Sequence, residues 1–264
     1  MRQVLGIPAG AAIATAVVAA SHSAPVVTTW GQVRNRVLPR LAGVGARDGV
    51  ALTFDDGPDP VSTPAFLDAL DALGVRATFF LLGTLVARAP SLTSEITAAG
   101  HEVAVHGWDH RSMLLRLPPA ALDGLRRARD VITAASGATP TMYRPPFGQL
   151  SVSALAGARG AGLQTVLWTV WGADWVASAT PESVLHELGE PRGGATILLH
   201  DSDCTSTPGS WRTTLAALPR VVEQCAAAGL AVRPLGEHLH QAMPPPVPPP
   251  LPATVGQPAP SVIP

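Results

Sequence analysis

The feature that most restricts the fold is an alternation of short apolar runs with longer amphipathic segments. The apolar runs have the length of strands, which we expect at residues 50–54, 77–82, 102–107, 141–145, 165–170, 196–200 and 230–234. The segments between them have helical spacing, and we expect helices at residues 62–73, 90–99, 119–136, 151–161, 181–188 and 212–228. Strands separated by helices favour an α/β fold with a parallel sheet or barrel.

The composition excludes several classes of protein. Hydrophobic residues make up 47% and charged residues 14% of the 264 positions, which is typical of a chain with a large core and not of a disordered one. The formal net charge of -1 lacks the basic excess of a nucleic-acid binder. All 18 basic residues are Arg, so the chain can use neither a Schiff-base lysine nor a phosphate-loop lysine.

The ends of the chain differ in composition from its centre. Residues 1–24 contain an apolar run after a basic start, which predicts a signal peptide or a membrane anchor. We assign residues 25–47 to a linker and residues 48–240 to one catalytic domain. Residues 241–264 are rich in proline, and this composition predicts an extended, disordered tail.

Polar side chains follow the expected strands at their carboxyl ends, where parallel α/β folds place their active sites. Asp55 and Asp56 follow the first strand in the string TFDDGPDP, and adjacent side chains point in different directions, so one carboxylate can bind a metal while the other accepts a proton. His106 ends the third strand, and His110 follows four residues later, a spacing that lets two imidazoles face one way on a helical turn. One Asp and two His leave open coordination positions, which suits a catalytic site of the zinc type.

Three later strands add further groups. Arg144 opens the rigid string RPPFG, and an Arg near Asp55 would keep that carboxylate ionised. The string WTVWGADW at residues 168–175 holds three of the six Trp, and Trp beside Asp at a strand end can hold sugar and acyl groups. His200 ends the sixth strand, where it is placed for general acid catalysis.

In this order, the five segments resemble the five motifs of the polysaccharide deacetylase family, the NodB-like carbohydrate esterases, over residues 50–201. The resemblance implies a distorted (β/α)7 barrel that uses one divalent metal to remove N- or O-acetyl groups from polysaccharides. It implies that Asp55 is the catalytic base and that Arg144 orients it. It also implies that His200 is the catalytic acid and that Asp174 supports it.

The same resemblance implies a metal site and a substrate groove. The metal ligands would be Asp56, His106 and His110. Zn²⁺ is the metal we expect first, with Co²⁺, Ni²⁺ and Mn²⁺ as alternatives. The backbone N–H of Phe147 would stabilise the oxyanion, and Trp175 and Leu198 would line the groove for the acetyl methyl group.

The chain departs from the family pattern at three positions. Gly107 stands where a Ser or Thr usually braces the loop, and Phe147 replaces a Tyr whose assigned role is carried by the backbone. Trp171 takes the place of a frequent acidic residue, so the support of His200 depends on Asp174 alone. None of these changes removes a metal ligand, the base or the acid.

Other functions remain open at this point. A two-carboxylate glycosidase would use Asp55 and Asp56, but adjacent carboxylates do not flank a glycosidic bond at ~5 to 9 Å, and the His pair would have no role. Two His and one carboxylate also hold iron in non-haem oxygenases. A third alternative is a catalytically inactive wall-binding module, which would have lost one of the metal-binding side chains.

The expected partner is an acetylated polysaccharide, with peptidoglycan, chitin oligomers and acetylated xylan as alternatives. We expect no nucleic-acid partner, and a contact with the membrane only through the N-terminal anchor. We also expect the protein to be a monomer that is secreted or associated with the cell envelope, outside the cytoplasm.

We also predict that the two cysteines are unpaired. Cys204 follows His200 by four residues and so stays near the active-site face, whereas Cys225 lies far along the next helix. About 14 helical residues span ~21 Å, and a disulfide needs Cα atoms within ~7 Å.

Overall fold

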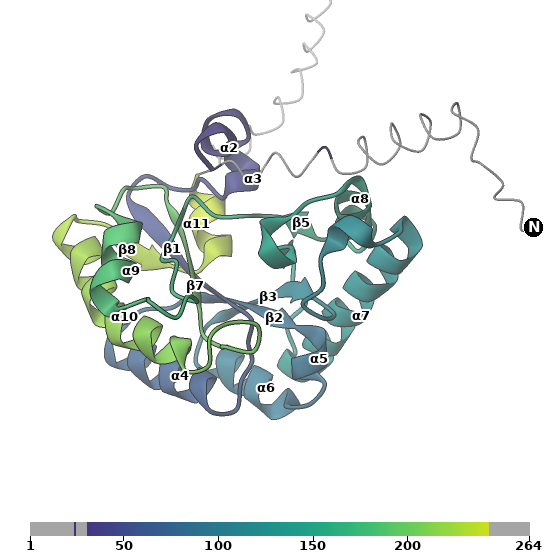
Figure 1. Cartoon of the computed structure of the whole chain (residues 1–264), viewed down its shortest axis with the longest axis horizontal. Helices are drawn as coiled ribbons and strands as arrows, with labels where there is room; N and C mark the ends of the chain where they lie inside the picture. Colours follow the sequence, from purple (N-terminus) through teal and green to yellow (C-terminus); the bar gives the residue numbers. More distant parts are fainter. Residues whose placement is uncertain (1–23, 25–30, 243–264) are drawn as a thin grey trace, which may run out of the picture.

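The computed structural model describes residue 24 and residues 31–242 of the chain (Figure 1). Nearly all of the expected signal peptide or anchor, and the proline-rich tail from residue 243, lie outside the described residues. Within the described part of the chain, no helix has both the length and the apolar character needed to cross a bilayer.

The strands form one parallel sheet that curls into a distorted, open barrel, which confirms the α/β fold expected from the sequence. The strands are β1 (Gly49–Asp55), β2 (Thr78–Leu82), β3 (Glu102–Gly107), β4 (Met142–Tyr143), β5 (Gln164–Thr165), β6 (Val170–Trp171), β7 (Thr196–His200) and β8 (Ala231–Arg233). Their order is β5-β4-β3-β2-β1-β7-β6, with β8 paired to β1.

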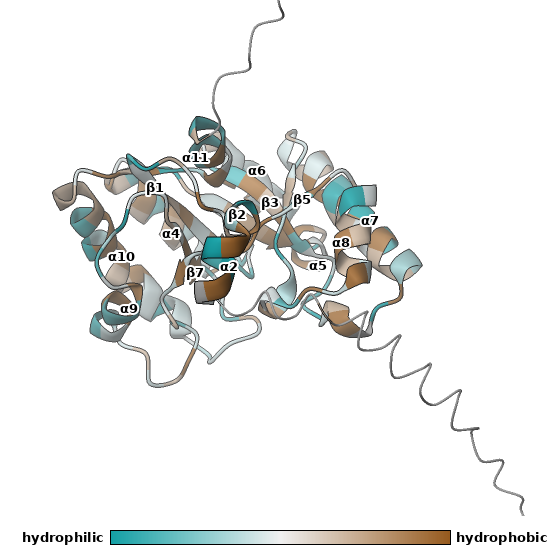
Figure 2. Cartoon of the chain, turned by 90° about the horizontal axis from the view of Figure 1, so that it is seen from above, coloured by the Kyte–Doolittle hydropathy of each residue, from teal (hydrophilic) through white to brown (hydrophobic). Residues whose placement is uncertain are grey.

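Helices cover the outside of this sheet (Figure 1). They are α2 (Gly31–Val37), α3 (Pro39–Ala42), α4 (Ser62–Ala72), α5 (Gly83–Val86), α6 (Pro90–Ala98), α7 (Pro118–Ser136), α8 (Val152–Gly160), α9 (Pro181–Leu188), α10 (Ser210–Ala227) and α11 (Leu235–Gln241). Two short 3₁₀ turns, Met113–Leu115 and Pro146–Gly148, lie in loops. Figure 2 shows apolar residues on inner strands such as β3 and polar residues on α7.

The core explains why β1 lies at the centre of the barrel. Every residue of β1 is buried, as expected for a parallel strand covered on both faces. Phe54 of β1 packs against Phe66 of α4 and Phe79 of β2, with ring centroids 5.1 and 5.2 Å apart. β1 therefore carries Asp55 and Asp56 to the middle of the carboxyl-end edge of the sheet.

The fifth expected strand, at residues 165–170, is interrupted in the structure. β5 pairs with β4, whereas β6 pairs with β7 at the opposite edge of the sheet. Residues 166–169 cross between the two edges: the N–H of Val166 donates to the carbonyl of Tyr143 at 2.9 Å, and that of Thr169 to Thr196 at 3.0 Å. The run therefore pairs with one edge at its start and with the other edge at its end, so the ladder between β4 and β7 is incomplete and the barrel stays open here.

Residues 31–47, which the sequence places in a linker, instead form α2 and α3 and the segment that joins them to β1. Ala42 is fully buried, and the carbonyl of Leu41 accepts the N–H of Leu167 at 2.7 Å. The Thr196 hydroxyl donates to the carbonyl of Gly43 at 2.6 Å. Both helices are too short to give an amphipathic pattern, so their contacts with the barrel had no signal in the sequence.

Both cysteines are free, as predicted. Cys225 is buried in α10, and Cys204 lies in the loop between β7 and α10.

Candidate active site

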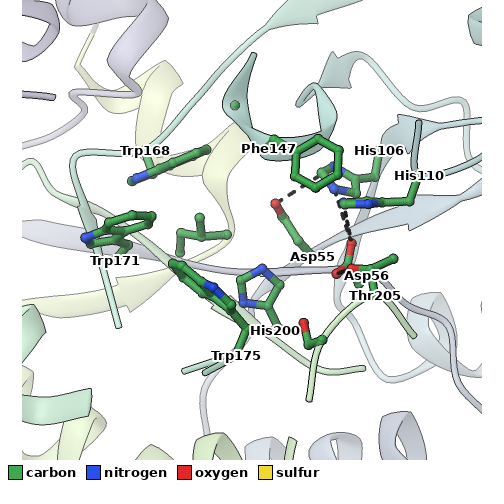
Figure 3. A pocket seen from close by; sticks show the side chains of 13 residues that line it. Asp55, Asp56, His106, His110, Phe147, Trp168, Trp171, Trp175, His200 and Thr205 are labelled. Carbon is green, nitrogen blue, oxygen red and sulfur yellow. Dashed lines mark hydrogen bonds and ion pairs between the residues drawn. The ribbon is translucent and has the colours of Figure 1, made fainter. Parts of the chain in front are cut away.

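The polar groups singled out in the sequence meet at the carboxyl ends of β1, β3 and β7. Asp55, Asp56, His106, His110 and His200 line a cavity of about 390 Å³ together with several aromatic side chains (Figure 3). Arg144 and Asp174, which contact Asp55 and His200, are not among the lining residues. The lining residues are Asp55, Asp56, His106, His110, Phe147, Gly148, Trp168, Trp171, Trp175, Leu198, His200, Thr205 and Ser206. The sequence thus identified most of the cavity.

The two adjacent aspartates point to different partners. Asp55 is the last residue of β1 and lies in register with His200 of β7. Asp56 has a φ of 77°, in the left-handed region that few L-residues adopt. This turn of the backbone directs Asp55 toward Arg144 and Asp56 toward the two histidines (Figure 3).

Arg144 holds Asp55 from inside the barrel. Its Nη1 donates to Oδ1 of Asp55 at 2.6 Å and to the hydroxyl of Thr53 at 2.9 Å, while Nη2 donates to the carbonyl of Leu167 at 2.9 Å. The side chain is fully buried, with its guanidinium carbon 4.0 Å from the Phe80 ring centroid. Burial lowers the pKa of Arg144, and the neighbouring Asp55 carboxylate opposes that shift. The contact fixes the rotamer of Asp55.

Asp56, His106 and His110 bring three potential ligand atoms within 4.8 Å of one another. Oδ1 of Asp56 lies 3.3 Å from Nε2 of each histidine. This oxygen is buried and has no hydrogen-bond partner among the described residues. Two imidazole nitrogens and one unpaired carboxylate oxygen, all facing one point, fit a divalent cation.

The other ring nitrogen of His106 explains its orientation. Nδ1 lies 2.9 Å from the backbone carbonyl of Arg144, so Nδ1 carries the proton and Nε2 presents its lone pair to the cluster. His110 lies in the bend after β3 and not on the helical turn that its spacing suggested. The pair converges nevertheless, because the bend folds His110 back over the strand end.

Thr205 completes the surroundings of Asp56, and sequence reasoning did not identify it. Its hydroxyl donates to Oδ2 of Asp56 at 2.6 Å, and the thiol of Cys204 donates to the Asp56 carbonyl at 3.3 Å. Oδ2 is thereby occupied, while Oδ1 remains directed at the imidazoles. The only signal in the sequence was the position of Thr205 in a polar loop shortly after β7.

The charges at this cluster favour the forms that bind metal. Burial raises the pKa of Asp56, but the neighbouring histidines, His106 above all, outweigh it and hold the pKa well below its usual range. Burial and the neighbouring His106 lower the pKa of His110 to about 4. At neutral pH, an ionised carboxylate therefore faces a neutral imidazole at His110, as ligation requires.

His200 lies on the other side of the cavity and is held by Asp174. Its Nδ1 is 2.8 Å from Oδ1 of Asp174, and its backbone N–H donates to Oδ2 at 2.8 Å. Thr214 also donates to Oδ2, at 2.7 Å. Burial lowers the pKa of His200, but the charge and hydrogen bond of Asp174 raise it to about 9. His200 is therefore protonated at neutral pH, with Nε2 as its remaining donor.

The two residues expected in the groove, Trp175 and Leu198, and the oxyanion candidate Phe147 also line the cavity. Trp175 meets His200 at a centroid distance of 5.4 Å and an angle of 72°. Leu198 lies beside Trp171 in the register of β6 and β7. Phe147 is 56% exposed and stands 4.5 Å from the His110 ring, with a backbone φ of 59°.

The structure explains one departure from the family pattern. Gly107 has a φ of 113°, a conformation that a Ser or Thr at this position could adopt only with strain. Glycine ends β3 here and allows the bend that returns His110 to the cluster.

Comparisons with known proteins support the fold and identify the family. The profile of the polysaccharide deacetylase family matches residues 43–166. A chitooligosaccharide deacetylase of Bradyrhizobium sp. (strain ANU 289) is 37% identical over 201 residues, which cover 73% of this chain and 91% of that protein. The peptidoglycan-N-acetylglucosamine deacetylase PgdA of Listeria monocytogenes (strain 10403S) is 32% identical over 69% of this chain, a span that is 38% of the length of PgdA.

Among solved structures, a family 4 carbohydrate esterase from Streptomyces lividans in complex with acetate matches with a TM-score of 0.64 and 33% identity. The match covers 71% of this chain and 92% of that one. Fold and site together thus define a carbohydrate esterase built on an open α/β barrel. The chain belongs to the polysaccharide deacetylase family and is a hydrolase that acts on acetylated polysaccharide.

Proposed function

We propose that this enzyme uses one divalent metal to remove N-acetyl groups from a cell-wall or chitin-like glycan. The observation that carries the proposal is the cluster of Asp56, His106 and His110 between two catalytic groups of opposite character, Asp55 and His200. Deacetylases of chitooligosaccharide and of peptidoglycan are relatives of the chain, which supports this class of substrate.

Asp56, His106 and His110 would hold the metal through one carboxylate oxygen and two Nε2 atoms. When bound there, the metal supplies Lewis acidity toward the acetyl carbonyl and the attacking water. Two nitrogens and one oxygen suit Zn²⁺ first, and they also suit Co²⁺, Ni²⁺ and Mn²⁺.

Asp55 acts as the general base. Arg144 holds its carboxylate in place through the 2.6 Å hydrogen bond. Asp55 takes one proton from the water, whose oxygen forms a bond to the carbonyl carbon of the acetyl group. The backbone N–H of Phe147 donates to the oxygen that becomes negatively charged.

His200 acts as the general acid. Its raised pKa keeps a proton on the ring, and Asp174 leaves Nε2 to face the cavity. When the bond between the carbonyl carbon and the sugar nitrogen breaks, Nε2 gives its proton to that nitrogen. The products are acetate and a free amine, and without this proton the leaving group would be an unstable amide anion. Trp175 and Leu198 enclose the acetyl methyl group.

This function implies where the enzyme works and with which partners. The N-terminal segment would direct the chain out of the cytoplasm or anchor it at the membrane, and the catalytic domain would act as a monomer on glycan in the cell envelope. The proposal includes no nucleic-acid partner. A glycosidase activity is disfavoured because the Asp56 carboxylate faces the two histidines and not a second carboxylate across a bond.

The test is a screen for acetate release by the purified chain. The substrates are N-acetylated chitooligosaccharides, intact peptidoglycan and O-acetylated xylan, each assayed before chelation, after EDTA, and after return of Zn²⁺, Co²⁺, Ni²⁺ or Mn²⁺. We expect acetate from an N-acetylated glycan, loss with EDTA and recovery with metal. New reducing ends without acetate would mean a glycosidase, and metal binding without turnover would mean an inactive binding module.

A further inference from the structure

The segment that crosses the open side of the barrel is held by side chains from outside it. Three consecutive carbonyls accept hydrogen bonds: that of Leu167 from Arg144 at 2.9 Å, that of Trp168 from Nη2 of Arg34, and that of Thr169 from the Asn35 amide at 3.2 Å. Arg144 belongs to the proposed catalytic site, but Arg34 and Asn35 belong to α2. The N-terminal helix therefore takes part in holding this segment.

Arg34 is buried at this contact. Its side chain is only 3% exposed, and its guanidinium carbon lies 5.3 Å from the centroid of the Trp168 ring. Burial and the charge of Arg144 lower the pKa of Arg34 to about 10, so the guanidinium remains charged at neutral pH. A charged donor gives the Trp168 carbonyl a stronger hydrogen bond than a neutral one would.

Trp168 is part of the substrate cavity, and its ring has little freedom to move. It stacks on Trp171 at a centroid distance of 6.2 Å and an angle of 18°. Its ring edge also fits against Gly148, where an added Cβ would lie 2.4 Å from the Trp168 ring. A shift of the Trp168 backbone would therefore displace the aromatic wall that runs from Trp168 to Trp175 along the cavity (Figure 3).

The helix that supplies this support lies outside the part of the chain that the family profile matches. The profile begins at residue 43, whereas α2 spans Gly31–Val37. Helices α2 and α3 lie together at one edge of the barrel (Figure 1). Their contact with the cavity wall is thus a feature of this chain's own N-terminal segment.

We propose that Arg34 is a positioning residue for substrate binding: it holds Trp168 in the cavity wall and makes α2 a part of the active-site structure. The inference rests on the proposed function only for the identity of the substrate. It implies that a change at Arg34, which does not line the cavity, alters the binding of glycan and leaves the chemistry intact.

The test compares Arg34→Met with Arg36→Met in the full chain. Both changes remove one Arg from α2, but Arg36 is exposed, so it serves as the matched control. For Arg34→Met we expect KM for N-acetylated chitopentaose to rise on the order of tenfold with kcat changed less than about twofold. We also expect faster amide hydrogen exchange in residues 166–169, where Leu167 and Thr169 now donate to Leu41 and Thr196. Arg36→Met should match the wild type in both measurements.

Two further variants keep the proposal testable if Arg34→Met folds poorly. Asn35→Ala removes only the hydrogen bond to the Thr169 carbonyl and should give smaller changes in the same direction. Arg34→Lys keeps a charged donor, so its KM should lie between those of the wild type and Arg34→Met. An unchanged KM in a variant whose segment 166–169 exchanges faster would overturn the positioning role, as would equal behaviour of Arg34→Met and Arg36→Met. If the wild-type enzyme releases no acetate from any glycan, the proposed function fails, and the exchange comparison still decides whether Arg34 holds this segment.

Discussion

The carboxylate of Asp174 binds His200 at two points: Oδ1 lies 2.8 Å from Nδ1, and Oδ2 accepts the His200 backbone N–H at 2.8 Å. Asp174 is 1% exposed, so this charge is not screened by water. The pair fixes both the direction of the imidazole and its protonation. Position 171, where the family resemblance leads one to expect an acidic residue, is Trp171 in this chain, so Asp174 is the carboxylate that contacts His200.

Replacing Asp174 by Asn should move the alkaline limit of activity. In the proposed mechanism the active form of His200 is protonated, and Asp174 raises its pKa to about 9, so activity should fall as the pH rises through about 9. In Asp174→Asn the pKa of His200 drops and the limit moves to lower pH. A pH profile of kcat for both proteins measures the shift. Coincident profiles would show that Asp174 does not set the protonation of the acid.

The same pair predicts how stability depends on pH. The pKa of His200 is about 9 in the folded protein against an ordinary value of 6.5, so the folded state holds the proton more tightly. This contribution to the free energy of unfolding is complete below about pH 6.5 and is lost as the pH rises to about 9. Melting temperatures between pH 6 and 10 should therefore fall more for the wild type than for Asp174→Asn. An equal fall in both proteins would contradict the linkage.

Metal binding should depend on His106 and not on Asp55. His106→Ala removes one of the three convergent ligand atoms, so we expect both the metal content and the activity to be lost. Asp55→Asn leaves those atoms in place and should retain the metal while kcat falls by about 10² to 10⁴-fold, the range for a lost general base. Elemental analysis of the two variants, beside acetate release, separates the roles. Loss of metal from Asp55→Asn would reverse the assignment of the two aspartates.

Thr205 should tune the affinity for the metal. Its hydroxyl holds Oδ2 of Asp56 at 2.6 Å, which leaves Oδ1 directed at the histidines. Loss of such a supporting hydrogen bond typically weakens metal binding by about 10 to 100-fold. We expect this loss of affinity in Thr205→Val and not in Ser206→Ala, which changes the next residue of the same cavity. Competition with a chelating dye measures both, and equal affinities would exclude a supporting role for Thr205.

The difference between Thr205 and the metal ligands shows what could be predicted from the sequence. Asp56 and His106 follow apolar strands, and parallel strands bring such ends together, so their meeting could be predicted. Thr205 and Arg34 lie in a loop and in a short helix, where no periodic pattern gives the direction of a side chain. The interruption at residues 166–169 was equally hidden, because the apolar run is continuous and only the pairing with two different edges divides it.

The thiols offer a test of the region around Asp56. Cys204 is an exposed residue, but partial desolvation of its thiol and the charge of Asp56 raise its pKa to about 12, whereas Cys225 is buried and burial raises its pKa to about 11. Only the thiolate attacks a disulfide reagent, so in chelator-treated native protein at neutral pH both thiols should react on the order of 10²-fold or more slowly than in the unfolded chain. Unfolding without reductant should then release two thiols per chain, because both cysteines are free.

A fast native reaction that disappears in Cys204→Ser would show that the thiol of Cys204 does not lie against the Asp56 carbonyl. Fewer than two thiols after unfolding would mean either that the cysteines pair within one chain, so that the position of α10 relative to the loop after β7 is wrong, or that two chains are cross-linked.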